Sequence, residues 1–329
     1  MTLKHDNKAR GFDMPERIET LFGLQLREWP LFSENYDHCA ETLKEEVELT
    51  ADMVPCSWRI HKMLLNHRKN SLAANIDSKA IAERKCFLCA DNRPEEQDSI
   101  RWRDYEILVN PYPIADNHLT IAHTEHTPQR IIGHIRDMAA LTRIVPTSCV
   151  FYNGPKCGAS APDHMHFQSF AESFSTNIWM SPALLTEIAQ TGAAHLYIPT
   201  EDNSIFPYFI IDSGKDKDLE AMFNKVYAAL PPSEPEPMMN IVMFKNGSKT
   251  RTLIVPRKAH RPSFYGDGEG QMLVSPASVE MLGTFVTSRK DDFERLDIPT
   301  VERIYREVCL SEEEFENIVE KINEQTTVH

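Results

Sequence analysis

Hydrophobic positions change their spacing along the chain near Cys86, and this change separates two kinds of expected structure. In residues 14–70, stretches such as PERIETLFGLQLR and HCAETLKEEVELT carry apolar residues every three or four positions, which predicts a mostly helical segment. From Cys86 onward, the short apolar runs 105–114 and 118–123 are typical of strands, with a turn-like ADN between them. We therefore expect an N-terminal helical extension followed by a sheet.

The segment 127–144 returns to helical spacing. Thr127 suits the N-cap position of such a helix, and Pro128 suits its first helical position. Apolar residues line one face of this expected helix, namely Ile131, Ile132, Ile135, Met138 and Leu141. The runs SCVFYNG and HMHFQSF then predict two strands, which a loop from Gly154 to Asp163 connects.

The second half of the chain repeats this order of elements. Two strands, a helix, two strands around the hairpin signal Asn246-Gly247 and a last helix are expected at 194–199, 208–214, 217–230, 240–244, 250–257 and 312–325. Ser311 and Glu314 form a capping-box pattern for the last helix. The repeated order predicts an α+β fold of two similar halves, residues 1–175 and 176–329, although the halves share no obvious sequence repeat.

Length, charge and cysteine content narrow the function classes. A chain of 329 residues exceeds the size at which one hydrophobic core stops growing, which agrees with two halves. The net charge of −14 and the lack of a basic cluster disfavour long nucleic acid as a partner, but a local group of basic side chains can still bind a small anion. Without an apolar N-terminal run or a membrane-length segment, and with seven cysteines, a reducing cytoplasm is the expected location.

Two histidines and a glutamine alternate in the expected strand HMHFQSF. Side chains in a strand alternate between faces, so His164, His166 and Gln168 point to one side while Met165 and Phe167 point to the core. The preceding loop, NGPKCGAS, offers Gly154, Gly158 and Ser160, whose backbone N–H groups and hydroxyl suit phosphate oxygens. By itself, the same pattern is also typical of a half-exposed strand whose polar residues face water.

A cysteine pair with zinc-type spacing precedes this strand. Cys86 and Cys89 have the spacing of half a zinc site, although a redox motif and a buried structural pair share it. Histidines that offer the other half follow in the sequence, namely His118, His123, His126 and His164. Two thiolates and two imidazoles make a closed tetrahedral set, which suits structural rather than catalytic zinc.

Several of these motifs together resemble the transferase branch of the histidine-triad superfamily. HMHFQ resembles the H-φ-H-φ-Q signature of that branch, and CFLCADNRP resembles the cysteine pair of galactose-1-phosphate uridylyltransferases. HLTIAHTEH and YEILVNPYPI are similar to two further segments of the superfamily, so the resemblance covers roughly residues 84 to 170 in the family's order. SPASVEMLGTFVTSRKDDFERL is similar to the end of GDP-hexose phosphorylases and, more loosely, of diadenosine tetraphosphate phosphorylases, which are built from two histidine-triad-like halves.

The resemblance implies roles for individual residues. It implies that His166 is the nucleophile, that His164 and Gln168 are the other motif residues, and that Asn110 contacts the nucleotide ribose. The phosphate loop is implied at Asn153, Gly158 and Ser160, and the zinc ligands at Cys86, Cys89, His126 and His164. His123 stands where the superfamily often has proline, so the choice between His123 and His126 as ligand is open. Some phosphorylases of this branch have no zinc.

The implied reaction is transfer of a nucleoside monophosphate through a nucleotidyl-histidine. An amide such as Gln168 cannot exchange protons at neutral pH, so a phosphate acceptor is favoured over water. Donors for the phosphoryl charge are expected from the loop and Lys156. The basic hairpin with Lys245, Lys249, Arg251 and Arg257 could bind a phosphate across the cleft, but such a charge cluster is more typical of a solvated hairpin.

We expect a nucleotide or nucleotide-sugar substrate and an anionic phosphate acceptor as partners. A homodimer is compatible with this assignment. A catalytically silent nucleotide-binding protein and a histidine-triad hydrolase are the alternatives, and Gln168 argues against the hydrolase. The base, the sugar and the identity of the acceptor are not specified by the sequence.

Overall fold

A computed structural model of the chain describes residues 13–42, 44–49, 58–73, 78–145, 148–171, 184–200 and 204–327. Within these residues, the helices are α1 (Met14–Glu28), α2 (Pro30–Ala40), α3 (Lys69–Leu72), α4 (Ser78–Glu83), α5 (Ile135–Ile144), α6 (Asp216–Ala229), α7 (Ser278–Met281), α8 (Lys290–Arg295), α9 (Ile298–Val308) and α10 (Glu312–Thr327), with short 3-10 turns η2 (Asn66–Arg68) and η3 (Ala90–Asn92).

The strands of the described residues form one large and one small sheet. They are β1 (Lys44–Leu49), β2 (Trp58–Leu64), β3 (Ile100–Trp102), β4 (Tyr105–Val109), β5 (Leu119–His123), β6 (Ser148–Asn153), β7 (His166–Ala171), β8 (Leu185–Thr191), β9 (Ala194–Pro199), β10 (Phe209–Ser213), β11 (Met239–Asn246), β12 (Lys249–Pro256) and β13 (Thr284–Thr287).

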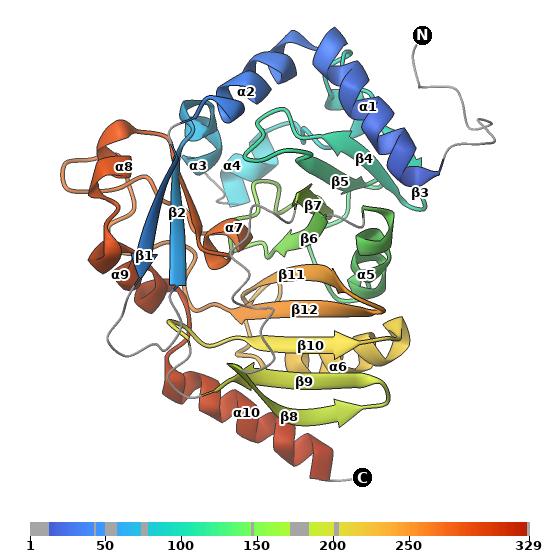
Figure 1. Cartoon of the computed structure of the whole chain (residues 1–329), viewed down its shortest axis with the longest axis vertical. Helices are drawn as coiled ribbons and strands as arrows, with labels where there is room; N and C mark the ends of the chain where they lie inside the picture. The colour runs from blue at the N-terminus through green and yellow to red at the C-terminus, as the bar shows by residue number, and fades with distance from the viewer. Residues whose placement is uncertain are drawn as a thin grey trace.

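The large sheet has ten antiparallel strands in the order β3-β4-β5-β7-β6-β11-β12-β10-β9-β8. From its outer edge to the centre of the sheet, the first half has the order β3-β4-β5-β7-β6 and the second half has the order β8-β9-β10-β12-β11. In both halves the fourth and fifth strands of the chain are exchanged in the sheet, and the halves meet where β6 pairs with β11. One helix follows the third strand of each half, α5 in the first and α6 in the second. Figure 1 shows the strands stacked from β4 to β8. The expected α+β fold of two similar halves is therefore confirmed.

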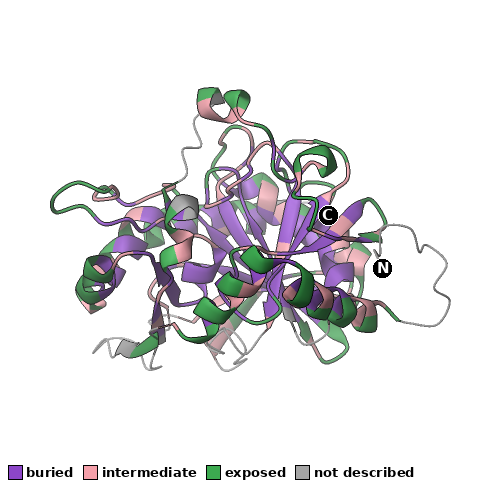
Figure 2. Cartoon of the chain, turned by 90° about the horizontal axis from the view of Figure 1, so that it is seen from above, coloured by how far each residue is buried: buried purple, intermediate pink, exposed green. Residues whose placement is uncertain are grey.

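Two hydrophobic cores lie on the two faces of the large sheet. Helices α1, α5, α6 and α10 contribute to the core that also holds Met165, Phe167 and Ile241. The other core holds Phe151, Phe170 and residues of β2, β13, α7 and α9. Alternate residues of β7 thus face different cores, as expected for a strand that is covered on both sides. Figure 2 shows the buried residues concentrated along the strands, with exposed residues on the outer helices.

The predicted helical content of residues 14–70 is wrong for part of this segment. Helices α1 and α2 are present, but Lys44–Leu49 and Trp58–Leu64 are antiparallel strands. The reason is tertiary: β2 also pairs in parallel with β13, more than 200 residues later in the chain, so long-range backbone pairing overrides the local helical spacing. The N-terminal extension is therefore only partly helical.

The expected helix 127–144 begins later than its sequence signals indicate. α5 starts at Ile135, with His134 at the N-cap, and Gly133 has φ +84°. The residues before α5 instead pair with the segment that precedes β7: the Met165 N–H donates to the Thr127 carbonyl, and the Gln129 N–H donates to the Pro162 carbonyl. Thr127 and Pro128 are therefore not the start of a helix, since the backbone groups of Thr127 and Gln129 are paired with other segments.

The expected strand-like run 105–114 is too long, because β4 ends at Val109, but the hairpin and the last capping box agree with the structure. Asn246 pairs with Lys249 across the hairpin, and Gly247 in the turn has φ +60°, which glycine adopts without strain. The Ser311–Glu314 capping box is formed, because the N–H of each residue donates to the side-chain oxygen of the other.

The predicted boundary at residue 175 lies between residues 172 and 183, outside the described residues, so it stays a prediction. Among the described helices, none combines the length and apolar character that crossing a bilayer requires.

Candidate active site and metal-ligand cluster

His166 is buried at the start of β7, with 3% of its surface exposed. Its Nδ1 lies 2.8 Å from the His164 carbonyl oxygen, which only accepts hydrogen bonds, so Nδ1 carries the proton and Nε2 keeps its lone pair. Burial lowers the pKa of His166 to about 4, although the bond to the carbonyl opposes this shift. The ring is therefore a neutral nucleophile or acceptor at physiological pH.

Gln129 holds the backbone on both sides of His166. Its Oε1 accepts from the His166 N–H at 2.8 Å, and its Nε2 donates to the carbonyls of His166 and Asn153, each at 3.0 Å. The side chain is fully buried. Helical spacing in the sequence placed Gln129 in an expected helix, so its role was not predicted. In the structure its side chain connects the backbone of β6 to that of β7.

Gln168 faces the same side of β7 as His166, and its amide orientation is set by His118. The Ile114 N–H donates to Nδ1 of His118, so the ring proton is on Nε2, which donates to Oε1 of Gln168 at 3.0 Å. Burial and, second, the positive charge of Arg68 lower the pKa of His118 to about 3. Because His118 stays neutral and donates from Nε2, the side-chain oxygen of Gln168 faces His118 and its NH₂ group faces away from that ring.

Asn110 follows β4 and lies beside this pair. Its Nδ2 donates to Oγ1 of Thr120 at 3.1 Å, and its Oδ1 accepts from the Tyr112 N–H at 3.0 Å. The Nδ2 atom is also 3.4 Å from Nε2 of His118. Asn110, His118 and Gln168 thus form one polar group across β4, β5 and β7.

The loop Gly154–Asp163 connects β6 to β7. Gly158 has φ +95°, and a Cβ atom there would lie 2.5 Å from the Ala277 Cβ, so the loop packs tightly against the segment before α7. The side-chain oxygen of Asn153 accepts from the Ser278 N–H at 2.8 Å and from Asn240 at 3.0 Å. Ser160 is partly exposed on this loop. Asn153 and Gly158 thus both contact the second half of the chain, through Ser278 and Asn240 and through Ala277.

Four potential metal ligands converge beside the same loop. The ligand atoms of Cys86, Cys89, His126 and His164 all lie within 4.8 Å of one another. Nδ1 of His164 is 3.3 Å from Sγ of Cys86, and Nδ1 of His126 is 3.2 Å from Sγ of Cys89. These are the four residues that the sequence resemblance implied as ligands.

The chemistry of this cluster fits a metal ion. The Nε2–H of His164 donates to the His123 carbonyl at 2.7 Å, so the lone pair on Nδ1 faces the sulfur atoms. Burial raises the pKa of the Cys86 thiol, but the close contact with His164 and hydrogen bonds from the N–H groups of Leu88 and Cys89 outweigh burial and lower this pKa to about 6. Cys86 is thus disposed to be a thiolate, the form that binds metals.

His123, the alternative ligand, lies outside the cluster. Its Nδ1 accepts from the Glu125 N–H at 3.1 Å, and its ring packs edge-on against Tyr105, with 5.3 Å between ring centroids. The geometry therefore selects His126 over His123 as the fourth member of the ligand set.

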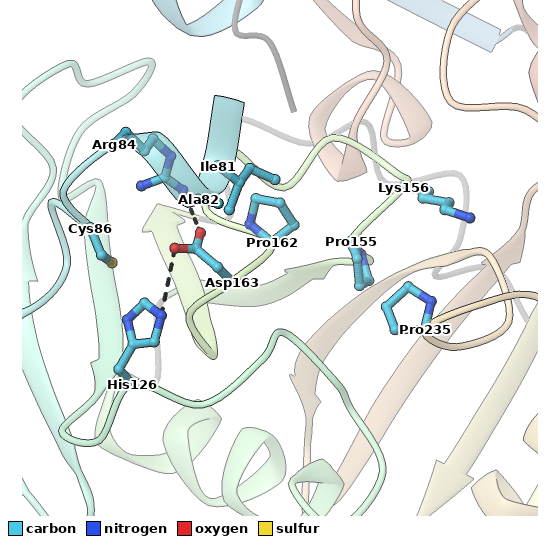
Figure 3. Close-up of a pocket in the computed structure, with 10 residues that line it drawn as sticks. All are labelled: Ile81, Ala82, Arg84, Cys86, His126, Pro155, Lys156, Pro162, Asp163 and Pro235. Carbon is cyan, nitrogen blue, oxygen red and sulfur yellow. Dashed lines mark hydrogen bonds and ion pairs between the residues drawn. The ribbon is translucent and has the colours of Figure 1, made fainter. Parts of the chain in front are cut away.

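A pocket of about 690 Å³ opens beside the cluster and the loop. Figure 3 shows Asp163 between Arg84 and His126, with which it forms ion pairs, while Lys156, Pro155 and Pro235 lie farther along the pocket. The carboxylate of Asp163 lies 3.7 Å from Nε2 of His126, whose other ring nitrogen faces Cys89. Lys156 is exposed, as expected for a cation that meets a ligand from solvent.

The basic hairpin of the second half does not reach this site. Asn240 of β11 pairs with Asn153 near the loop, whereas Lys245 and Lys249 lie at the opposite end of β11 and β12. Arg251 is buried and paired with Asp212, 2.8 Å from Nε to Oδ1. Arg257 is also buried and donates to Asn240 and to four backbone carbonyls, those of Pro276, Val308, Ala259 and His260. The expected role as phosphate ligands is therefore wrong for Lys245, Lys249 and Arg251, whereas Arg257 lies beside Asn240, which bonds Asn153 and the Cys157 carbonyl of the loop.

Comparisons with known proteins agree with this architecture. Residues 21–171 match a family model described as a domain of unknown function (DUF4922), and residues 208–328 match one described as GDPGP1-like, C-terminal domain. None of the curated proteins matches the chain by sequence.

Structures of yeast Ap4A phosphorylase Apa2 are similar to the chain along most of its length. The complex with Ap4A has a TM-score of 0.58 at 15% identity, covering 90% of this chain and 97% of that chain. The complex with AMP has a TM-score of 0.53 at 16% identity, covering 91% and 96%, and a further Apa2 structure has 0.56 at 14%, covering 91% and 95%. The chain therefore shares the fold of this phosphorylase along most of its length.

Proposed function

We propose that this chain is a nucleotidyltransferase of the phosphorylase type, which transfers a nucleoside monophosphate through a covalent bond to Nε2 of His166. The observation that carries the proposal is the hydrogen bond from Nδ1 of His166 to the His164 carbonyl, because it leaves Nε2 unprotonated in a buried, neutral ring. The fold shared with a phosphorylase that has been crystallised with Ap4A and with AMP supports it.

The reaction has two displacement steps at one phosphorus atom. Nε2 attacks the α-phosphorus of an NDP-sugar or a dinucleoside polyphosphate, and the bond to the bridging oxygen breaks, so a sugar phosphate or nucleotide leaves. An oxygen of an anionic phosphate then attacks the same phosphorus, the N–P bond breaks, and the imidazole is restored. The acceptor arrives as an anion and needs no general base.

The neighbouring side chains have distinct roles in this proposal. The NH₂ group of Gln168, turned away from His118, donates to a phosphoryl oxygen and carries no proton to water. Asn110 binds the ribose, and Gly158, Ser160 and Asn153 belong to the loop that surrounds the phosphates. Asn153 acts through the loop, because its side-chain oxygen is engaged by the second half.

The ligand cluster holds zinc in this proposal, through Cys86, Cys89, His126 and His164. A closed set of two thiolates and two imidazoles gives the ion a structural role, tying the CFLC segment to the residues around His166. His164 connects the two functions, because its ring belongs to the cluster and its carbonyl orients His166.

Mass spectrometry of the intact protein tests the proposal. The chain is incubated with ADP-, GDP- and UDP-sugars and with dinucleoside tetraphosphates, and the mass added to the protein identifies the nucleoside monophosphate. We expect one adduct per chain on the peptide that contains His166, and its discharge by phosphate or by a sugar phosphate. Binding of nucleotide without an adduct would instead support a silent nucleotide-binding protein, and discharge mainly by water would support a hydrolase. A cytoplasmic location and a homodimer stay predictions.

A further inference from the structure

The loop from Asn110 to His118 carries two members of the polar group at the site. Asn110 begins the loop, and His118, which orients Gln168, ends it. The Asn110 N–H donates to the His118 carbonyl at 2.9 Å, so the ends of the loop are tied together by the sheet. The residues between them, Pro111 to Asn117, have no place in that sheet, and their position depends on other contacts.

The Ala171 N–H of β7 donates to the Asp116 carbonyl and the Ile114 N–H donates to His118, and side chains of the N-terminal extension provide four further contacts in two neighbouring pairs. From α2, Asn35 donates to the Pro111 carbonyl at 2.8 Å, and the hydroxyl of Tyr36 donates to the Asp116 carboxylate at 3.0 Å. From η2, His67 donates to the Pro113 carbonyl at 2.9 Å and Arg68 donates to the Tyr112 carbonyl at 3.1 Å. The four donors thus reach four different residues of one loop.

Asn35 and His67 make part-buried contacts, and the protonation of His67 and Tyr36 keeps their donors available. Asn35 is 7% exposed, and burial lowers the pKa of His67, so its ring stays neutral with one N–H to donate. Burial and the hydrogen bond to Asp116 raise the pKa of Tyr36 to about 12, so its hydroxyl remains protonated. Each donor is therefore present throughout the neutral pH range.

We propose that Asn35, Tyr36 and His67 are positioning residues that hold the Asn110–His118 loop in the conformation required for nucleotide binding. This inference rests on the proposed function and adds to it a role for the N-terminal extension. The extension then acts on Asn110 indirectly, through the backbone of the loop that follows it. Loss of one donor loosens the loop and weakens binding before it affects the chemistry at His166.

Three variants test this role in the full-length protein. Asn35→Ala and His67→Ala remove a donor, and Tyr36→Phe removes only the hydroxyl while keeping the ring against Phe22 and Phe32. Since one hydrogen bond contributes about 1 kcal/mol, we expect each to raise KM for the nucleotide substrate by about fivefold, with kcat within about twofold of wild type. His67→Gln keeps an N–H donor and should restore most of the affinity.

Gln25→Ala is the matched control. Gln25 also lies in the extension, is 1% exposed, and makes the same kind of bonds, to the Glu96 carbonyl and the Asp98 N–H, but outside the loop. It should lower Tm as much as Asn35→Ala does while leaving KM unchanged. Hydrogen–deuterium exchange should become faster across 110–118 in the three variants and not in the control.

The outcomes separate this inference from the proposed function. If wild type forms the His166 adduct but the three variants follow Gln25→Ala in KM and in exchange, the positioning role is wrong and the proposed function stands. If wild type forms no adduct with any nucleotide, the proposed function fails and this inference fails with it, whatever the exchange shows.

Discussion

The carbonyl oxygen of His164 accepts a hydrogen bond from Nδ1 of His166, and the His164 ring belongs to the metal-ligand cluster. One residue therefore joins the cluster to the ring that we propose as nucleophile. Because the bond fixes both the tautomer and the orientation of His166, we expect a change in the cluster to alter the position of Nε2. Five predictions follow from this site and its surroundings.

Substitution of the nucleophile should abolish the covalent intermediate. His166→Ala removes Nε2, so no adduct should form and turnover should fall on the order of a thousandfold or more. His166→Gly with free imidazole should recover part of the activity, because the missing group fits the cavity. His195→Ala, which removes a histidine of the second half, serves as the control and should be active. An adduct formed by His166→Ala at the wild-type rate means that another residue is the nucleophile.

Adduct formation should be nearly independent of pH down to pH 5. Burial lowers the pKa of His166 to about 4, so the ring is still mostly neutral at pH 5, whereas an ordinary histidine of pKa about 6.5 would be about 3% neutral there. Single-turnover rates at pH 5 and 7.5 should agree within about twofold. The same shift makes the folded state less stable as pH falls from about 6.5 toward 4, since the unfolded chain binds the proton first.

Gln168→His should redirect the intermediate toward water. A histidine can shuttle a proton that an amide cannot, so the ratio of hydrolysis to transfer should rise, by about tenfold if general catalysis is even partly restored. Gln168→Asn keeps an amide and is the comparison, because it should slow transfer without raising hydrolysis. Product analysis with phosphate in excess measures both. Equal ratios in the two variants would exclude proton transfer as the reason for glutamine at this position.

Protein purified without chelators should contain about one zinc per chain. Cys86→Ser should lose the metal and lower Tm, because one thiolate of a closed set is removed. Cys39→Ser is the control, since Cys39 is also buried but lies outside the cluster, on α2. Elemental analysis and thermal unfolding give the result. Metal-free wild type with the Tm of the untreated protein would show that the cluster holds no structural ion.

Glu236 should make the protein less stable as the pH rises toward neutrality. Burial raises the pKa of this carboxyl to about 7, although hydrogen bonds from Tyr152 and the Ile131 N–H oppose the shift. A folded-state pKa above the unfolded value gives stability that is full below about pH 4.5 and is lost as pH rises through about 7. Glu236→Gln removes this dependence, so its Tm relative to wild type should be higher at pH 8 than at pH 5. A constant difference would contradict the raised pKa.

The sequence by itself determined the local features that depend on neighbouring positions. Alternation along HMHFQ placed His166 and Gln168 on the same side of β7, with Met165 and Phe167 in the core. The two cysteines of CFLC and the capping box at Ser311 also follow from short spacings. Such patterns survive folding because a strand or helix turns successive side chains by a constant amount.

Only the tertiary structure decided which distant groups meet. Local spacing could not show that Lys44–Leu49 is a strand, that Gln129 bridges β6 and β7, or that Arg251 is paired with Asp212. The choice of His126 over His123 likewise depends on the course of the backbone after β5. The physical reason is that buried polar groups must find partners, and those partners come from segments that lie far away in the sequence.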